Sequence, residues 1–77
     1  MTMEELHEFA DSPEIRESLP RLRQWAPLEF TDHEVCFILA CTSNDLDPDD
    51  WIRLFEGCIG KTDQEVHDLA QRMTAPE

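Results

Sequence analysis

The acidic segment from Asp45 to Glu56 comes nearest in this sequence to a pattern of metal-binding chemistry. It places carboxylates at the first, third, fifth and last positions of a calcium-binding loop. The sixth position of such a loop needs the glycine of a sharp turn, and here it is Asp50. Pro48 also makes the stretch a favourable helix start, because proline suits the first turn. We therefore predict helix capping with no metal or cofactor. A calcium-dependent shift in thermal stability would favour the alternative.

Other residues are of types that can bind phosphate or a metal ion, but their spacing does not suit either kind of site. The glycines within Gly57–Thr62 are too close together for a phosphate-binding loop, and no strand is predicted before them. His7, His33 and His67 are far apart in the sequence, and no cysteine–histidine spacing is typical of a zinc site. We predict surface histidines and no catalytic residues. The chain is therefore not expected to be an enzyme.

The cysteines Cys36, Cys41 and Cys58 are odd in number and form no Cys-x-x-Cys motif. A disulfide framework would need an even count and a secretory context. Because two of them lie in an apolar stretch, we predict reduced and mostly buried thiols. This favours a reducing, intracellular compartment.

Net charge is the strongest global signal. The 77 residues, enough for one domain, include 18 acidic and 6 basic side chains, which gives a formal net charge of −12. A field of this sign repels nucleic acid and anionic membranes, and it favours a basic partner. The alternative is that the acidity only keeps a small domain soluble. No apolar run approaches the length of a membrane span.

The positioning elements are predicted to be helices, because helical periodicity dominates and no strand pattern is clear. Thr2 is expected to cap a short helix with Leu6, Phe9 and Ala10. Ser12 and Pro13 predict a second helix start. One apolar face follows at helical spacing, formed by Ile15, Leu19 and Leu22. Pro20 interrupts or restarts this helix, and the segment is expected to end at 25–27.

Two capping boxes mark helix starts in the second half. Thr31–Glu34 predicts a helix that continues to about Thr42, and Thr62–Glu65 predicts a helix that continues to about Met73. Between them, Asp47 as cap and proline at the next position predict a third helix. Gly57 and Gly60 are expected to bracket its end.

The span from Phe30 to about Met73 resembles the Myb/SANT family of three-helix domains. The likeness lies in the aromatic and capped turn of Phe30–Glu34, the aromatic helix start of Trp51–Phe55, and the turn Gly60–Thr62. It implies an all-α, helix-turn-helix-related bundle with Phe30 and Trp51 in its core. The implied organisation is an N-terminal helical extension at 1–29, the three-helix domain at 30–74, and a tail at 75–77.

Two positions depart from the family pattern. Ala70 replaces the third core aromatic, so we expect the N-terminal segment to fill the remaining space. The helix that reads DNA in binding members is acidic here, with Lys61 and Arg72 as nearby cations. Because DNA binding needs several basic side chains on one face, direct DNA binding is not expected. The resemblance therefore implies the acidic, protein-binding type of SANT-like domain.

These observations predict a protein–protein interaction module in a nuclear chromatin, transcription or telomere assembly, and the nuclear part follows from the resemblance alone. The alternative is a small acidic inhibitor, such as a phage-type nucleic-acid mimic that blocks a basic site. The sequence predicts two alternative docking surfaces. The acidic candidates are Asp45, Asp47, Asp49 and Asp50. The apolar candidates are Leu6, Phe9, Leu22 and Trp25. Oligomeric state is not predicted.

Overall fold

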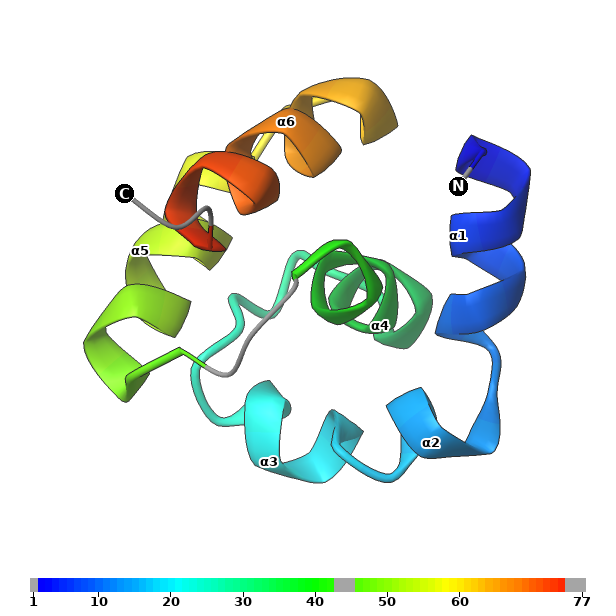
Figure 1. The fold of residues 1–77 in the computed structure, drawn as a ribbon. Helices are drawn as coiled ribbons and strands as arrows, with labels where there is room; N and C mark the ends of the chain where they lie inside the picture. Colours follow the sequence, from blue (N-terminus) through cyan, green and yellow to red (C-terminus); the bar gives the residue numbers. More distant parts are fainter. Residues whose placement is uncertain (1, 43–45, 75–77) are drawn as a thin grey trace.

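The computed structural model describes residues 2–42 and 46–74, and within these ranges the chain is all-helical, without a strand (Figure 1). The helices are α1 (Met3–Ala10), α2 (Pro13–Arg16), α3 (Leu19–Arg23), α4 (Asp32–Cys41), α5 (Pro48–Cys58) and α6 (Asp63–Thr74). Helix α4 lies in the middle of the molecule and packs against α1, α2, α3 and α6, while α5 packs against α6. The expected all-α class is therefore confirmed.

The helix starts follow the local capping chemistry. The Thr2 hydroxyl accepts a hydrogen bond from the Glu5 amide at 3.2 Å, which confirms the predicted cap of α1. At the start of α4, Thr31 and Glu34 form the predicted capping box, in which each side chain accepts from the backbone amide of the other. The same reciprocal pair joins Thr62 and Glu65 at the start of α6. Each box satisfies two amides that would otherwise lack helical partners.

The two proline-led helices begin differently. Ser12 and Asp47 occupy the predicted N-cap positions of α2 and α5, but neither side chain makes a capping hydrogen bond. The predicted N-cap positions are therefore confirmed, but without a capping hydrogen bond from the side chain. Their helices begin with the proline instead, whose fixed φ is already helical.

Pro20 divides the predicted N-terminal helix into two. Helix α2 ends at Arg16, four residues before Pro20, and α3 begins at Leu19. The proline lacks an amide hydrogen, and its ring would clash with the carbonyl group one helical turn earlier. The restart alternative is the one that the structure shows.

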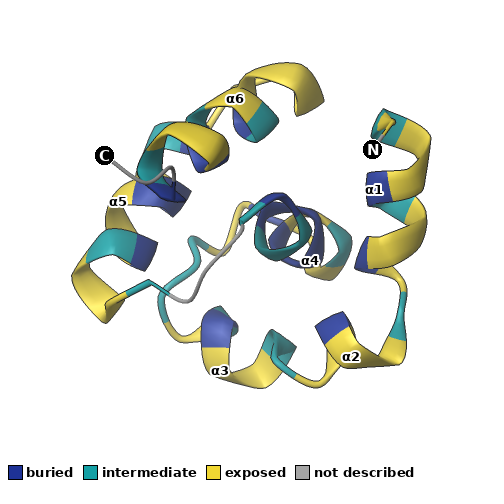
Figure 2. Ribbon diagram, in the orientation of Figure 1, coloured by how far each residue is buried: buried dark blue, intermediate teal, exposed yellow. Residues whose placement is uncertain are grey.

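The core lies around α4 and receives side chains from all six helices (Figure 2). Phe30 and Trp51 are both buried, and both rings lie next to Phe55, with centroid separations of 6.2 and 5.8 Å. The described part of this N-terminal segment, residues 2–29, contributes four buried side chains to the same core: Leu6, Ala10, Ile15 and Leu22. The predicted N-terminal extension is thus packed into the core that the second half of the chain builds.

Two glycines permit the turn from α5 to α6. A β-carbon on Gly57 would lie 2.8 Å from Cδ2 of Leu69, so the missing side chain lets α6 approach α5 closely. Gly60 has a φ of 74°, which side chains other than glycine adopt at a cost. This turn places the start of α6 beside α4 and α1, where the candidate site lies.

Candidate functional site

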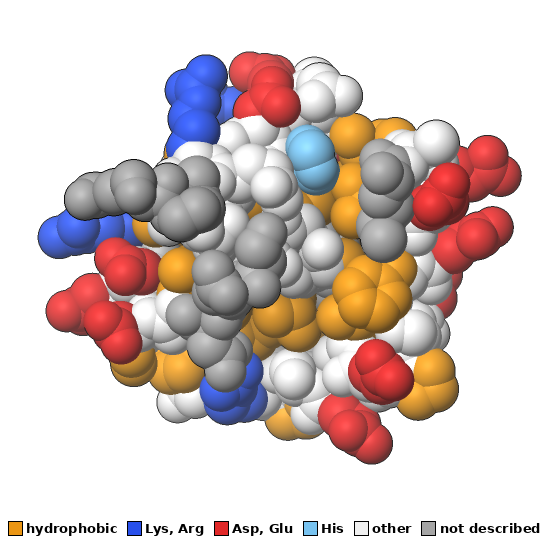
Figure 3. Space-filling view, in the orientation of Figure 1, with side chains coloured by type: hydrophobic (Ala, Val, Ile, Leu, Met, Phe, Trp, Pro, Cys, Tyr) orange, Lys and Arg blue, Asp and Glu red, His pale blue; other side chains and the backbone are white. Residues whose placement is uncertain are grey.

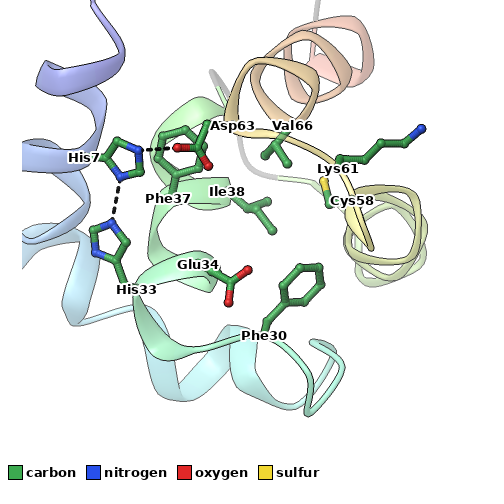
Figure 4. A pocket seen from close by; sticks show the side chains of 10 residues that line it. All are labelled: His7, Phe30, His33, Glu34, Phe37, Ile38, Cys58, Lys61, Asp63 and Val66. Atoms are coloured by element: carbon green, nitrogen blue, oxygen red, sulfur yellow. Dashed lines mark hydrogen bonds and ion pairs between the residues drawn. The ribbon is translucent and has the colours of Figure 1, made fainter.

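A cavity of about 110 Å³ opens between α4, α1 and the turn that joins α5 to α6 (Figure 4). Its apolar lining consists of Phe30, Phe37, Ile38, Cys58 and Val66. Its polar lining consists of His7, His33, Glu34, Lys61 and Asp63. Apolar lining with a few converging polar groups is the usual composition of a protein binding pocket, although this one is small. We therefore treat this cavity as the candidate functional site.

The charged side chains of Glu34 and Lys61 point in different directions at the cavity. Figure 4 shows the Glu34 carboxylate pointing toward Phe30 and Ile38, into the space that the lining residues surround. The Lys61 side chain extends away from that space, and its Nζ lies 4.0 Å from a carboxylate oxygen of Glu65. The carboxylate of Glu34 is therefore the charge directed into the cavity.

One wall of the cavity is a chain of hydrogen bonds between histidines and carboxylates. Nε2 of His7 lies 2.7 Å from Asp63 Oδ2, and Nδ1 of His7 lies 2.8 Å from Nε2 of His33. Nδ1 of His33 lies 3.1 Å from Asp11 Oδ1, which also accepts from Arg16 at 2.9 Å. These hydrogen bonds join four helices, α1, α2, α4 and α6. They also include Asp11, which directly follows α1.

The chain of hydrogen bonds ends on carboxylates, which accept hydrogen bonds when ionised. The outer ring nitrogen of each histidine is therefore placed to donate, from His7 to Asp63 and from His33 to Asp11. The two inner nitrogens lie 2.8 Å apart, within hydrogen-bond distance.

Ring geometry supports this pairing. The rings of His7 and His33 are only 8° from parallel, with centroids 5.1 Å apart. Together with the 2.8 Å nitrogen separation, this places them edge to edge in nearly one plane, as an N–H···N bond requires. The face of His7 stacks on Phe37 at 4.4 Å. The pair is therefore fixed both by packing and by hydrogen bonds.

Two of the three histidines, predicted as surface residues, are partly exposed and form a pair that the sequence did not predict. His7 and His33 have side chains 35% and 38% exposed and are joined to each other. They lie 26 residues apart, and His7 lies 56 residues from Asp63. No local sequence signal connects such distant positions, because the contact depends on how α1 packs on α4.

The thiols are buried, as predicted, and free. Burial raises the pKa of Cys41 to about 12 and that of Cys58 to about 11. It also raises the pKa of Cys36. A thiol is a nucleophile or metal ligand as the thiolate, so these side chains act as small core residues. Among residues 2–42 and 46–74, no group of three or more acidic, cysteine or histidine side chains is arranged to hold a metal ion.

The residues of the two predicted docking surfaces differ in exposure. Asp45 lies outside the described residues, Asp47 and Asp49 are exposed, and Asp50 is half-buried. Of the apolar candidates, Leu6 and Leu22 are buried in the core. Trp25 packs against the core and Phe9 is 37% exposed. Leu6 and Leu22 therefore serve packing, because their periodic apolar face points inward.

Comparison with known proteins adds no relative. A scan against models of protein families, a search of curated proteins and a search of solved structures each found no match to this chain. Within the described part of the chain, no helix has both the length and the apolar character to cross a bilayer.

Proposed function

We propose that this chain is a protein–protein interaction module that binds a partner with a basic surface and does not bind DNA directly. The observation that carries the proposal is the distribution of charge. Helix α6 presents exposed Asp63, Glu65 and Asp68, while Arg72 is its one Lys or Arg between Asp63 and Thr74. With a net charge of −12, phosphate contacts are disfavoured and contacts with cations are favoured.

The surface view agrees with a protein-binding role. Figure 3 shows carboxylates on both flanks of one face, Lys or Arg side chains on the left flank and at the lower edge, and hydrophobic atoms between the flanks. Interfaces combine an apolar centre with a polar rim. A basic partner with an apolar contact segment would match this arrangement.

A Myb/SANT-like arrangement of α4, α5 and α6 forms part of the proposal. It is supported by the burial of Phe30 and Trp51, each next to Phe55. From this likeness we propose a partner in a nuclear chromatin, transcription or telomere assembly. A small acidic inhibitor that imitates nucleic acid is the second candidate, and the small size and the charge of −12 favour it.

Fluorescence anisotropy with a labelled arginine-rich peptide and a labelled DNA duplex, at physiological salt, tests the proposal. We expect saturable binding of the peptide and no binding of the duplex. Duplex binding as tight as peptide binding would contradict the proposal, and so would an absence of peptide binding. A peptide with scrambled order separates general charge attraction from recognition of a defined segment.

A further inference from the structure

We infer that the cavity between α4, α1 and the α5–α6 turn receives one lysine or arginine side chain of the partner, an inference that rests on the proposed function. The aliphatic stem of that side chain would occupy the apolar lining, and its cationic end would meet the carboxylate of Glu34. Lysine and arginine combine these two characters, because a flexible apolar stem carries a charged head.

The whole cavity has the size of one side chain. Its volume is about 110 Å³, and Phe30, Ile38 and Val66 are among the apolar residues that line it. An engineered cavity of about 150 Å³ holds a benzene molecule, so this one accommodates the stem of a single long side chain and no larger ligand. A partner residue inserted here would be a central anchor of the interface.

The carboxylate of Glu34 is held in place before any partner arrives. Its Oε1 accepts the Thr31 amide at 3.0 Å, and the Glu34 amide donates to the Thr31 hydroxyl at 3.2 Å. A carboxylate offers about four lone-pair sites, so it can accept further hydrogen bonds. Because the capping box orders the side chain already, less conformational entropy is lost on binding.

The other charges near the cavity do not oppose the binding of a partner cation there. The Lys61 ammonium lies beside Glu65 and points away from the cavity. The carboxylates of Asp63 and Asp11 already form hydrogen bonds with the histidine pair. Glu34 is the negative group that a partner cation can still neutralise at the opening.

Two matched variants test this assignment, Glu34→Gln and Glu65→Gln. Each removes one negative charge from the third position of a capping box, and glutamine keeps the box because its carbonyl oxygen still accepts the amide. Only Glu34 lines this cavity. Both variants are checked for native thermal stability, and then titrated with the arginine-rich peptide and with the same peptide carrying citrulline, which is uncharged, in place of each arginine in turn.

We expect Glu34→Gln to weaken peptide binding about tenfold, as the loss of a charge-assisted hydrogen bond predicts, and Glu65→Gln to weaken it by about threefold at most. One citrulline position should reproduce the tenfold loss in the wild-type protein and add little in Glu34→Gln. Equal losses in the two variants would overturn the cavity assignment and leave the acidic interaction module standing. If the wild-type protein does not bind the peptide, both the proposed function and this inference fail.

Discussion

At the scale of single residues, many acidic side chains have a structural role as well as a charge. Glu34 and Glu65 hold helix starts, and hydrogen bonds from Thr62 lower the pKa of the Glu65 carboxyl. Asp11 accepts from both Arg16 and His33. A carboxylate with fixed hydrogen-bond donors is also an ordered feature of the surface. The acidity of this chain is therefore partly structural and partly available to a partner.

Gly60 allows a test at a single position. It has a φ of 74°, and a β-carbon added there would meet no atom within 4 Å. Gly60→Ala therefore changes backbone strain without a steric clash, and we expect it to lower the free energy of unfolding by about 1 kcal/mol. Urea denaturation measures the change. Gly60→Asn is the control, because asparagine tolerates this conformation better, and an equal loss in both variants would contradict the explanation.

At the scale of elements, the hydrogen bonds between histidines and carboxylates join several helices. The apolar core alone would define the relative orientation of these helices less precisely. His7 comes from α1, His33 from α4 and Asp63 from α6. The side chains are only partly buried, so each bond contributes modestly to stability. Their joint effect is to fix the orientation of α1 on α4, and with it one wall of the cavity.

Asp11 makes this connection dependent on pH. The hydrogen bond from Arg16, and then that from His33, lower the pKa of the Asp11 carboxyl below its ordinary value. A carboxyl with a lowered folded-state pKa stabilises the protein above its unfolded pKa, near 3.9, and this contribution is lost as the pH falls through the folded value. We expect Asp11→Asn to lower the melting temperature at neutral pH.

The difference in melting temperature between wild type and Asp11→Asn should then shrink as the pH falls below about 4. Circular dichroism melts between neutral and strongly acidic pH measure it. Asp49→Asn, which removes an exposed carboxylate at the start of α5, is the charge control. A difference that stays constant over the acid range would show that Asp11 acts by packing instead of by its charge.

At the scale of the whole molecule, packing of a small core stabilises the fold, while repulsion within a large net charge destabilises it. The molecule extends about 26 × 25 × 23 Å and carries a net charge of −12. Charges of one sign on a body of this size repel one another and destabilise the compact state. The ion pairs Arg16–Asp11 and Lys61–Glu65 involve exposed side chains, which contribute little each.

Added salt should therefore stabilise the protein. We expect the melting temperature to rise between low salt and about 0.5 M sodium chloride, because screening weakens repulsion at distances beyond the Debye length. Differential scanning calorimetry at constant pH measures the shift. Sucrose at matched osmolality controls for general solute effects. A fall in melting temperature with salt would mean that attractive ion pairs outweigh the repulsion.

The sequence by itself determined where most helices begin and end. Capping boxes, prolines and glycines act within one turn of the chain, so Thr31, Thr62, Pro20 and Gly60 have the same local consequences whatever surrounds them. The apolar spacing likewise indicated an all-helical core and buried thiols.

Only the tertiary structure decided the candidate site. The partners of His7 lie 26 and 56 residues away, and the cavity combines side chains from α1, α4, the α5–α6 turn and α6. Such contacts depend on the angle and register at which helices pack, which no spacing along one helix encodes. For the same reason the sequence could not show that Glu34 faces a cavity.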